Sequence, residues 1–226
     1  VPPPRMAEAV AQGHVDAFWV GEPWGSDIVA RGVGDIVMAG SHVWGFAPEK
    51  VLAARHDWTV DNPETTQKLM RAVYQASRWL DLEENKPLAV EMLGRSEHLN
   101  LSHEVIEPAV TGMLTPTAGA DPIRVEHFLM FHDHAASFPW RSQAAWIAKQ
   151  LGADSTGTAA AMSCCRTDLY RKYLGPIGAD LPGASEKVEG AMNEKTAVAS
   201  SRGQMILAPD AFFDGRTFDF SSNAAE

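Results

Sequence analysis

Short helical patterns and short apolar runs alternate over the first quarter of the chain. Residues 4–13 have a helical pattern, in which Pro4 suits the first helical position and Gly13 suits the end. The apolar run at residues 15–20 then predicts a buried strand. The alternation continues with a helix from Pro23 to Arg31, closed by Gly32, and with short strands at residues 35–39 and 51–54. This order predicts an α/β layer around a mostly parallel sheet.

The pattern becomes mainly helical after residue 62. Asn62-Pro63-Glu64 is a helix-start signal, and the apolar residues that follow keep helical spacing (Leu69, Val73, Ala76 and Leu80). Further helices are predicted at residues 83–93, 102–114, 142–151 and 166–174, with a loop at 116–122. Residues 154–163 are small and polar and are interpreted as a mobile segment. The tail after Gly183 is interpreted as irregular, with a turn at Asp214-Gly215.

Composition limits the possible classes of protein. The chain has 226 residues, 45% of them hydrophobic, which is enough for a sizeable core in one or two domains. No apolar run approaches the roughly 20 residues of a membrane-spanning helix. The formal charge of −10 argues against a general nucleic-acid surface, although a local site for a small anion remains compatible with it. The start on a proline run, without an initiator methionine, leads us to expect a fragment cut in the middle of a fold.

Two corners near the start of the chain are candidate anion sites. Residues 2–4 and 21–23 each place a helix start after an expected strand end, where open α/β sheets collect ligands. Helix starts offer unpaired N–H groups, and Gly21 allows the backbone to approach a ligand closely. We expect Glu22 to accept bonds near the helix start or to pair with a cation. Three tryptophans are candidates for the walls of a pocket: Trp19, Trp24 and Trp44. The alternative, an ordinary core strand and turn, remains open on residue types alone.

Lys50 is the second candidate. It directly precedes the apolar run at residues 51–54, so its ammonium group could enter a cleft and hold an anion. The alternative is a solvated surface lysine, which is the commoner situation.

Metal binding and catalysis have little support in the sequence. His132 and His134 would share one face of a strand while Asp133 points away, and no further ligand cluster accompanies them, so a polar loop is favoured. Cys164 and Cys165 are adjacent and lack metal or redox spacing. No nucleophile stands with a base, and no phosphate-binding glycine loop is present. We therefore expect no enzyme, no cofactor and no metal.

Several segments together resemble a known family. They are "PPPRMAEAVAQGHVDAFWVGEPWGSDIVARGVG", "APEKVLAARHDW", "NPETTQKLMRAVYQASRWLDLEENK", "ASFPWRSQAAWIAKQLG", "RTDLYRKYLGPIGADLP" and "FFDGRTFDF". In combination they are similar to the nitrate-binding solute-binding proteins of bacterial ABC transporters. That group also includes bicarbonate-binding proteins and the cytoplasmic NasS-type nitrate sensor. The resemblance covers nearly all of the chain.

The resemblance implies a type II periplasmic-binding-protein-like α/β fold with two lobes, of which only the C-terminal half is present. Residues 1–45 would be the remainder of lobe 2, on the side of the ligand cleft. Residues 46–226 would be the C-terminal part of lobe 1, with added helices and an irregular tail. The ligand would lie in the cleft between the lobes.

The resemblance also implies which residues contact the ligand. By position in the motifs, Pro4 and Gly21 would line the pocket and Lys50 would be the positive partner of nitrate, with Glu22 and Trp24 as further candidates. Bicarbonate-binding relatives carry an acidic residue for calcium at the position of Lys50. A lysine there therefore favours nitrate or nitrite without a metal.

Three functions follow as alternatives. An importer subunit would be periplasmic or membrane-anchored and would dock on an ABC transporter permease. A NasS-like sensor would be cytoplasmic and would control a NasT-like RNA-binding antiterminator, without itself touching nucleic acid. An enzyme on the same fold, such as a thiamine-precursor synthase, would need a reactive histidine and a cofactor lysine, and no such pair is evident.

Overall fold

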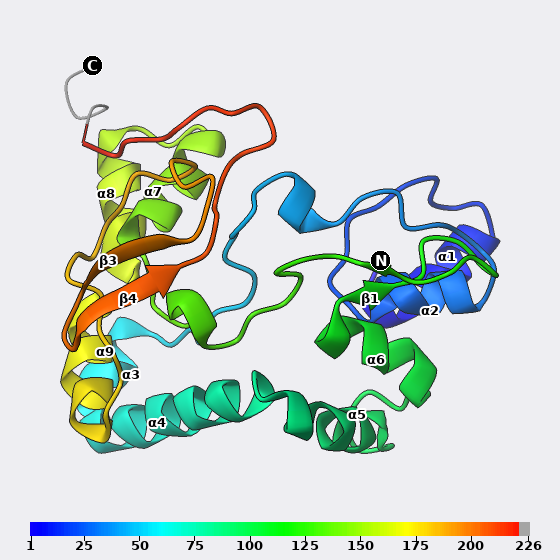
Figure 1. Ribbon diagram of the computed structural model, residues 1–226, viewed down its shortest axis with the longest axis horizontal. Helices are drawn as coiled ribbons and strands as arrows, with labels where there is room; N and C mark the ends of the chain where they lie inside the picture. Colours follow the sequence, from blue (N-terminus) through cyan, green and yellow to red (C-terminus); the bar gives the residue numbers. More distant parts are fainter. Residues whose placement is uncertain (222–226) are drawn as a thin grey trace. The chain divides into compact units, whose positions relative to one another are not determined.

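The computed structural model describes residues 1–221, which form two compact units (Figure 1). The first unit consists of residues 1–41 and 80–129, and the second consists of residues 42–79 together with the chain from residue 130 onward. The assignment of residues 1–45 and 46–226 to two lobes of a longer protein stays a prediction. Within the described residues, no helix is both long enough and apolar enough to cross a bilayer.

The first unit is mainly helical. Its helices are α1 (Met6–Ala11), α2 (Trp24–Ala30), α5 (Lys86–Gly94) and α6 (His103–Thr111), with 3-10 turns η1 (Pro3–Arg5) and η3 (Glu83–Asn85). Strands β1 (Met113–Leu114) and β2 (Ile123–Arg124) pair antiparallel. Helices α1 and α2 are joined by a cluster in which Met6 and Ala7 pack against Ile28, with Phe18 and Val33 at its edge. Both candidate corners are therefore carried by one packed helical pair.

The second unit combines helices with one hairpin. Its helices are α3 (His56–Asp61), α4 (Pro63–Leu80), α7 (Arg141–Gln150), α8 (Ser155–Cys164) and α9 (Thr167–Leu174). Three 3-10 turns accompany the helices: η2 (Gly40–His42) at the boundary of the units, η4 (Asp133–Ala135) and η5 (Gly175–Ile177). Strands β3 (Thr196–Ser200) and β4 (Gly203–Leu207) form the orange antiparallel hairpin in Figure 1, with Thr196 opposite Leu207.

Aromatic side chains dominate the core of the second unit. Phe138 contacts Trp140 at 4.9 Å and Tyr170 at 5.2 Å between ring centroids, in edge-to-face geometry. Tyr74 of α4 adds a third edge-to-face contact, at 6.3 Å from Tyr170. Leu174 of α9 is also buried in this cluster. The core therefore links α4, α9 and the segment before α7.

The three strands predicted in the first quarter of the chain are wrong for this structure. Residues 15–20, 35–39 and 51–54 are outside every helix and strand. Several of their apolar side chains are exposed, to 65% at Trp19, 94% at Val37 and 79% at Val51, although Ala39 is buried and Phe18 packs against the α1–α2 cluster. Ile36 donates one backbone bond to Pro116, but no ladder forms along these segments within residues 1–221. A strand requires a paired neighbouring backbone, and an apolar run alone does not supply one.

Two expectations for the C-terminal part are also wrong. Residues 154–163, interpreted as mobile, lie mostly in helix α8, whose start is capped by the Asp154 carboxylate accepting the Gly157 N–H at 2.7 Å. The tail after Gly183, interpreted as irregular, contains the β3–β4 hairpin. The predicted turn at Asp214-Gly215 is present, because the Gly215 N–H donates to the Phe212 carbonyl at 3.0 Å. The remaining predicted helices correspond to α1, α2, α4, α5, α6, α7 and α9.

Candidate functional site

The proline corner gives Pro4 an accessible position. Pro2 is extended and Pro4 lies in η1, whose turn is closed by the Arg5 N–H donating to the Pro2 carbonyl at 2.9 Å. Pro4 is exposed, whereas Met6 and Ala7, immediately beyond it, are buried. The rigid φ angle of proline and the buried helix behind it fix the direction of this corner. A ligand can therefore approach Pro4 without rearrangement of the core.

The second corner places Gly21 before α2. The peptide bond between Glu22 and Pro23 is cis, and the Trp24 N–H lies 3.3 Å from the Gly21 carbonyl. Gly21 is partly exposed, so its backbone is open to a small ligand. The alternative that a core strand leads into this corner is wrong, because residues 15–20 form no strand.

The carboxylate of Glu22 turns back onto α2. Its Oε2 accepts the Ser26 N–H at 3.1 Å, which is the first of the two arrangements expected from the sequence. Burial raises the pKa of the Glu22 carboxyl, and the bonds from Ser26 oppose this only in part. A Cβ atom at Gly25 would lie 2.7 Å from Oε1, so the glycine leaves room for this carboxylate. Any part that Glu22 has in binding a ligand stays a prediction.

The tryptophans do not act as one wall. Trp24 is partly buried at the start of α2, and Trp19 is largely exposed. Trp44 is only 4% exposed, because it packs against Trp146 and Phe212 with ring centroids at 4.6 and 5.1 Å. The expectation that Trp44 walls a pocket is therefore wrong, since its rings are covered by the core of its own unit.

Lys50 lies in the second unit on an anchored segment. The Phe213 N–H donates to the Val43 carbonyl at 3.0 Å, and Gln143 donates to the Phe46 carbonyl at 3.3 Å. The Lys50 side chain is 76% exposed, and its ammonium group contacts both carboxylate oxygens of Glu49, at 2.5 and 2.7 Å. The strand expected after Lys50 is absent, so the lysine follows a loop anchored at residues 43–46. An exposed ion pair of this kind contributes little stability, so an anion can replace the Glu49 carboxylate beside Lys50.

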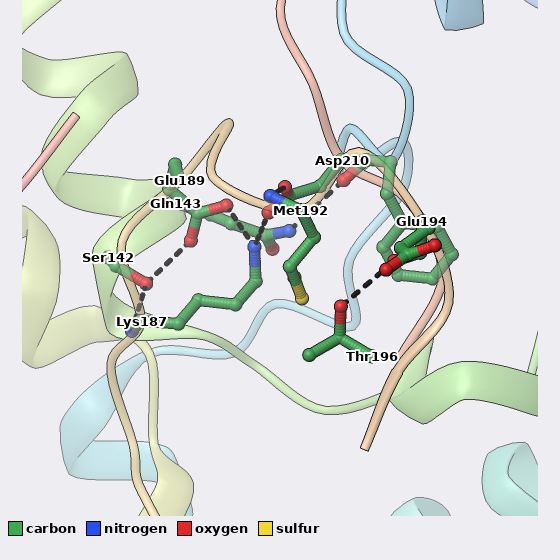
Figure 2. A network of polar contacts seen from close by, with 9 residues as sticks. Ser142, Gln143, Lys187, Glu189, Met192, Glu194, Thr196 and Asp210 are labelled. Atoms are coloured by element: carbon green, nitrogen blue, oxygen red, sulfur yellow. Dashed lines mark hydrogen bonds and ion pairs between the residues drawn. The ribbon is translucent and has the colours of Figure 1, made fainter. Parts of the chain in front are cut away.

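A buried polar network in the second unit was missed by the sequence reasoning (Figure 2). The Lys187 ammonium group lies between the carboxylates of Glu189 and Asp210, with an Nζ–Oε2 distance of 2.5 Å to Glu189. Ser142 donates to the other oxygen of Glu189 at 2.6 Å, and the Met192 N–H donates to the other oxygen of Asp210 at 2.9 Å. Every carboxylate oxygen thus has a donor inside the protein. We interpret the network as structural, because it offers no vacant acceptor to a ligand.

The sequence contained only a weak signal for this network. Lys187 and Glu189 alternate in the segment "SEKVEG", but Asp210 is more than 20 positions away and Ser142 is more than 40 positions away.

The residues considered as metal ligands, His132, Asp133 and His134, are not grouped as a metal site. Within residues 1–221, no three histidine, cysteine, aspartate or glutamate side chains gather as metal ligands.

Known proteins are similar to this chain over nearly its whole length. The profile of the NMT1-like family matches residues 1–94. The nitrate/nitrite binding protein NrtA of Synechococcus elongatus is 30% identical over 225 residues, which are 97% of this chain and 47% of that protein. The bicarbonate-binding protein CmpA of the same organism is 26% identical over 100% of this chain and 49% of its own length. The chain therefore spans about half the length of these curated relatives.

The fold agrees with the sequence relatives. The crystal structure of the periplasmic nitrate-binding protein NrtA from Synechocystis PCC 6803 matches with a TM-score of 0.82 and 26% identity, over 100% of this chain and 56% of that one. This match confirms the predicted fold class, a partial type II periplasmic-binding-protein-like α/β fold. Together these matches support the family of nitrate- and bicarbonate-binding solute-binding proteins of ABC transporters, to which the chain is similar over nearly its whole length.

Proposed function

We propose that the intact protein binds nitrate or nitrite as the solute-binding component of an ABC-type importer. The observation that carries this proposal is the exposed position of the Lys50 ammonium group. The lysine side chain is mostly exposed and follows an anchored loop, and within residues 1–221 its ammonium group is held only by the carboxylate of the neighbouring Glu49. One positive charge and a few backbone N–H groups suit a small planar monoanion.

Pro4 and Gly21 are proposed as the further contacts, with Glu22 and Trp24 beside them. The evidence for these contacts comes from the surroundings of each residue. Pro4 and Gly21 are accessible, and each precedes a helix of the packed α1–α2 pair. A neutral proline surface and a glycine backbone suit an anion that is bound without a competing carboxylate. Glu22 is partly buried and its carboxylate accepts the Ser26 N–H, so it is turned toward α2.

The proposal includes a transporter permease as partner and excludes catalysis. The relatives compared above are solute-binding proteins, so we propose no catalytic step for this chain. The sensor alternative, with its antiterminator partner, gains no support from these relatives. Bicarbonate is the ligand named for one of them, and it is therefore the competing anion in the test.

The test is a calorimetric titration of the intact protein with nitrate, with nitrite, and with bicarbonate in the presence and absence of calcium. We expect micromolar binding of nitrate or nitrite, on the order of −8 kcal/mol. Lys50→Ala should weaken it by roughly 1.5–3 kcal/mol, which is the range for a hydrogen bond to a charged group. Lys68→Ala, at an exposed lysine of α4 in the same unit, is the matched control. Calcium-dependent bicarbonate binding, or nitrate binding that does not depend on Lys50, would overturn the proposal.

A further inference from the structure

A pocket of about 250 Å³ opens on the second unit, and it involves none of the residues proposed for nitrate. Segments far apart in the sequence converge there: α4, residues 132–138, α9, the loop at residues 178–180 and the β3–β4 hairpin. The volume is at the small end of ligand pockets, so its occupant would be a small molecule.

The floor of the pocket is aromatic and well held. Tyr74, Phe138 and Tyr170 are all buried, and they meet edge to face. The Tyr170 hydroxyl lies 2.8 Å from the Ser137 hydroxyl, which fixes its orientation. Since these rings are only 4%, 2% and 6% exposed, they close the base of the pocket with apolar groups, which favours a ligand with an apolar body at that end.

Two guanidinium groups border this floor. Arg78 lies over the Tyr74 ring, with Cζ at 6.0 Å from the centroid, and within residues 1–221 it has no carboxylate partner. Arg202 is oriented by an Nη2 bond of 2.6 Å to the Gly178 carbonyl, and its other guanidinium N–H groups have no acceptor in that part of the chain. Guanidinium donors of this kind suit a carboxylate.

The acidic residues of the pocket limit the charge of its ligand. Asp180 accepts bonds from the Ser200 and Ser201 hydroxyls and from the Arg202 N–H, at 3.0, 3.2 and 3.2 Å. Its carboxylate thus holds the hairpin turn that presents Arg202. Asp133 also lines the pocket, so two aspartates offset two arginines. A lining without net charge favours a monoanion over a polyanion such as phosphate.

The backbone at the edge of the pocket is strained. His134 and Ala135 are consecutive residues with φ of 57° and 61°, in the left-handed region that favours glycine. A 2.9 Å contact between His134 Nδ1 and the Ile206 carbonyl holds this turn against β4. Strain of this type persists where the surrounding structure enforces it, and it concentrates at ligand sites.

We propose that this pocket binds a small aromatic carboxylate. The carboxylate would be received by the guanidinium groups of Arg78 and Arg202, and the ring would lie against Tyr74 and Phe138. This site is separate from the nitrate contacts and does not depend on the proposed transport function.

The test is a titration of the intact protein with benzoate, followed by NMR chemical shifts or calorimetry. The comparison ligands are benzyl alcohol, which keeps the ring without the charge, and acetate and inorganic phosphate, which keep the charge without the ring. We expect benzoate to bind more tightly than all three, also in the presence of saturating nitrate. Arg78→Gln, at an exposed position of α4, should weaken benzoate at least tenfold.

Controls separate the pocket from general charge effects. Arg216→Gln removes an exposed arginine of the same unit that does not line the pocket, and it should leave benzoate affinity unchanged. Arg202→Lys keeps the positive charge but loses the planar guanidinium donors, so it should weaken benzoate binding several-fold. The proposal would be overturned if benzyl alcohol, acetate or phosphate bound as tightly as benzoate, or if benzoate did not bind at all. It would also be overturned if Arg216→Gln weakened benzoate binding as much as Arg78→Gln does. Nitrate binding can fail or succeed independently of all these outcomes.

Discussion

The hydroxyl of Ser142 donates a 2.6 Å hydrogen bond to the carboxylate of Glu189, 47 positions later in the chain, and both residues are fully buried. Ser142 also accepts the backbone N–H of Lys187 at 3.1 Å. The first turn of α7 is thereby attached to the segment that leads to the hairpin. Lys187 closes the arrangement, because its ammonium group pairs with the carboxylates of both Glu189 and Asp210.

Removing the cation of this network should destabilise the protein strongly. Lys187→Met leaves the carboxylates of Glu189 and Asp210 buried beside each other without a counter-charge. We expect a loss of about 3–5 kcal/mol in the free energy of unfolding, measured by urea denaturation. The exposed Lys195, changed to Met, is the control and should change stability by less than about 0.5 kcal/mol. Similar effects of the two variants would show that the network contributes no net stability.

Glu189 should also give stability a specific pH dependence. Burial raises the pKa of the Glu189 carboxyl more than Lys187 lowers it. A carboxyl whose pKa is raised by folding contributes stability below its unfolded value of about 4.3, and this contribution is lost as the pH rises through the folded value. Glu189→Gln removes this titration. The unfolding free energy of the wild type relative to the variant should therefore fall as the pH rises above about 4. Parallel pH profiles of the two proteins would contradict this expectation.

Gly190, directly after Glu189, should tolerate no side chain. Its φ is +79°, and an added Cβ would lie 2.7 Å from the Arg216 carbonyl oxygen and also meet the Phe212 ring. Gly190→Ala combines a left-handed conformation with this clash and should cost roughly 2–4 kcal/mol in thermal unfolding. Gly215 is a matched control, because its φ is +71° and nothing lies within 4 Å of an added Cβ. Gly215→Ala should lose only the unfolding free energy that the left-handed conformation costs, about 1–2 kcal/mol.

Reversal of the charge at Lys50 is the sharpest test of the anion site. Lys50→Glu would place two adjacent carboxylates, its own and that of Glu49, where nitrate is proposed to bind. We expect the calorimetric signal for nitrate to disappear and a cation-assisted ligand, such as bicarbonate with calcium, to become the candidate. Lys68→Glu applies the same charge change on α4 and should leave nitrate binding intact. Nitrate affinity that survives in Lys50→Glu would remove this lysine from the site.

The helices were predictable because their signals are local. In α4, the Asn62-Pro63-Glu64 start and the helical spacing of apolar residues were sufficient. The face that α4 buries was less evident, since Leu69 and Val73 remain about 40% exposed whereas Tyr74 is buried. The strands at residues 15–20, 35–39 and 51–54 were overpredicted, because pairing depends on a distant backbone that the pattern cannot supply.

The candidate site was predictable only in part. Motif resemblance directed attention to Pro4, Gly21 and Lys50, and the structure shows two of them accessible at helix starts and the third ion-paired to Glu49. The Lys187 network and the pocket at Arg78 could not be found from spacing. Both depend on side chains from segments far apart in the chain, such as Ser142 and Glu189 in the network or Arg78 and Arg202 in the pocket, and local patterns do not reveal such pairs.

The stack of Trp44, Trp146 and Phe212 has a consequence for Lys50, six positions beyond Trp44. Trp146 and Phe212 are nearly parallel, at 20° and 5.0 Å, so the start of the loop is clamped by rigid rings. An ammonium group on a loop that is fixed at one end explores a smaller volume than one on a flexible chain. Less conformational entropy is therefore lost when the ammonium group binds an anion. If Lys50 binds an anion as proposed, its affinity therefore depends partly on aromatic packing that lies outside the proposed contacts.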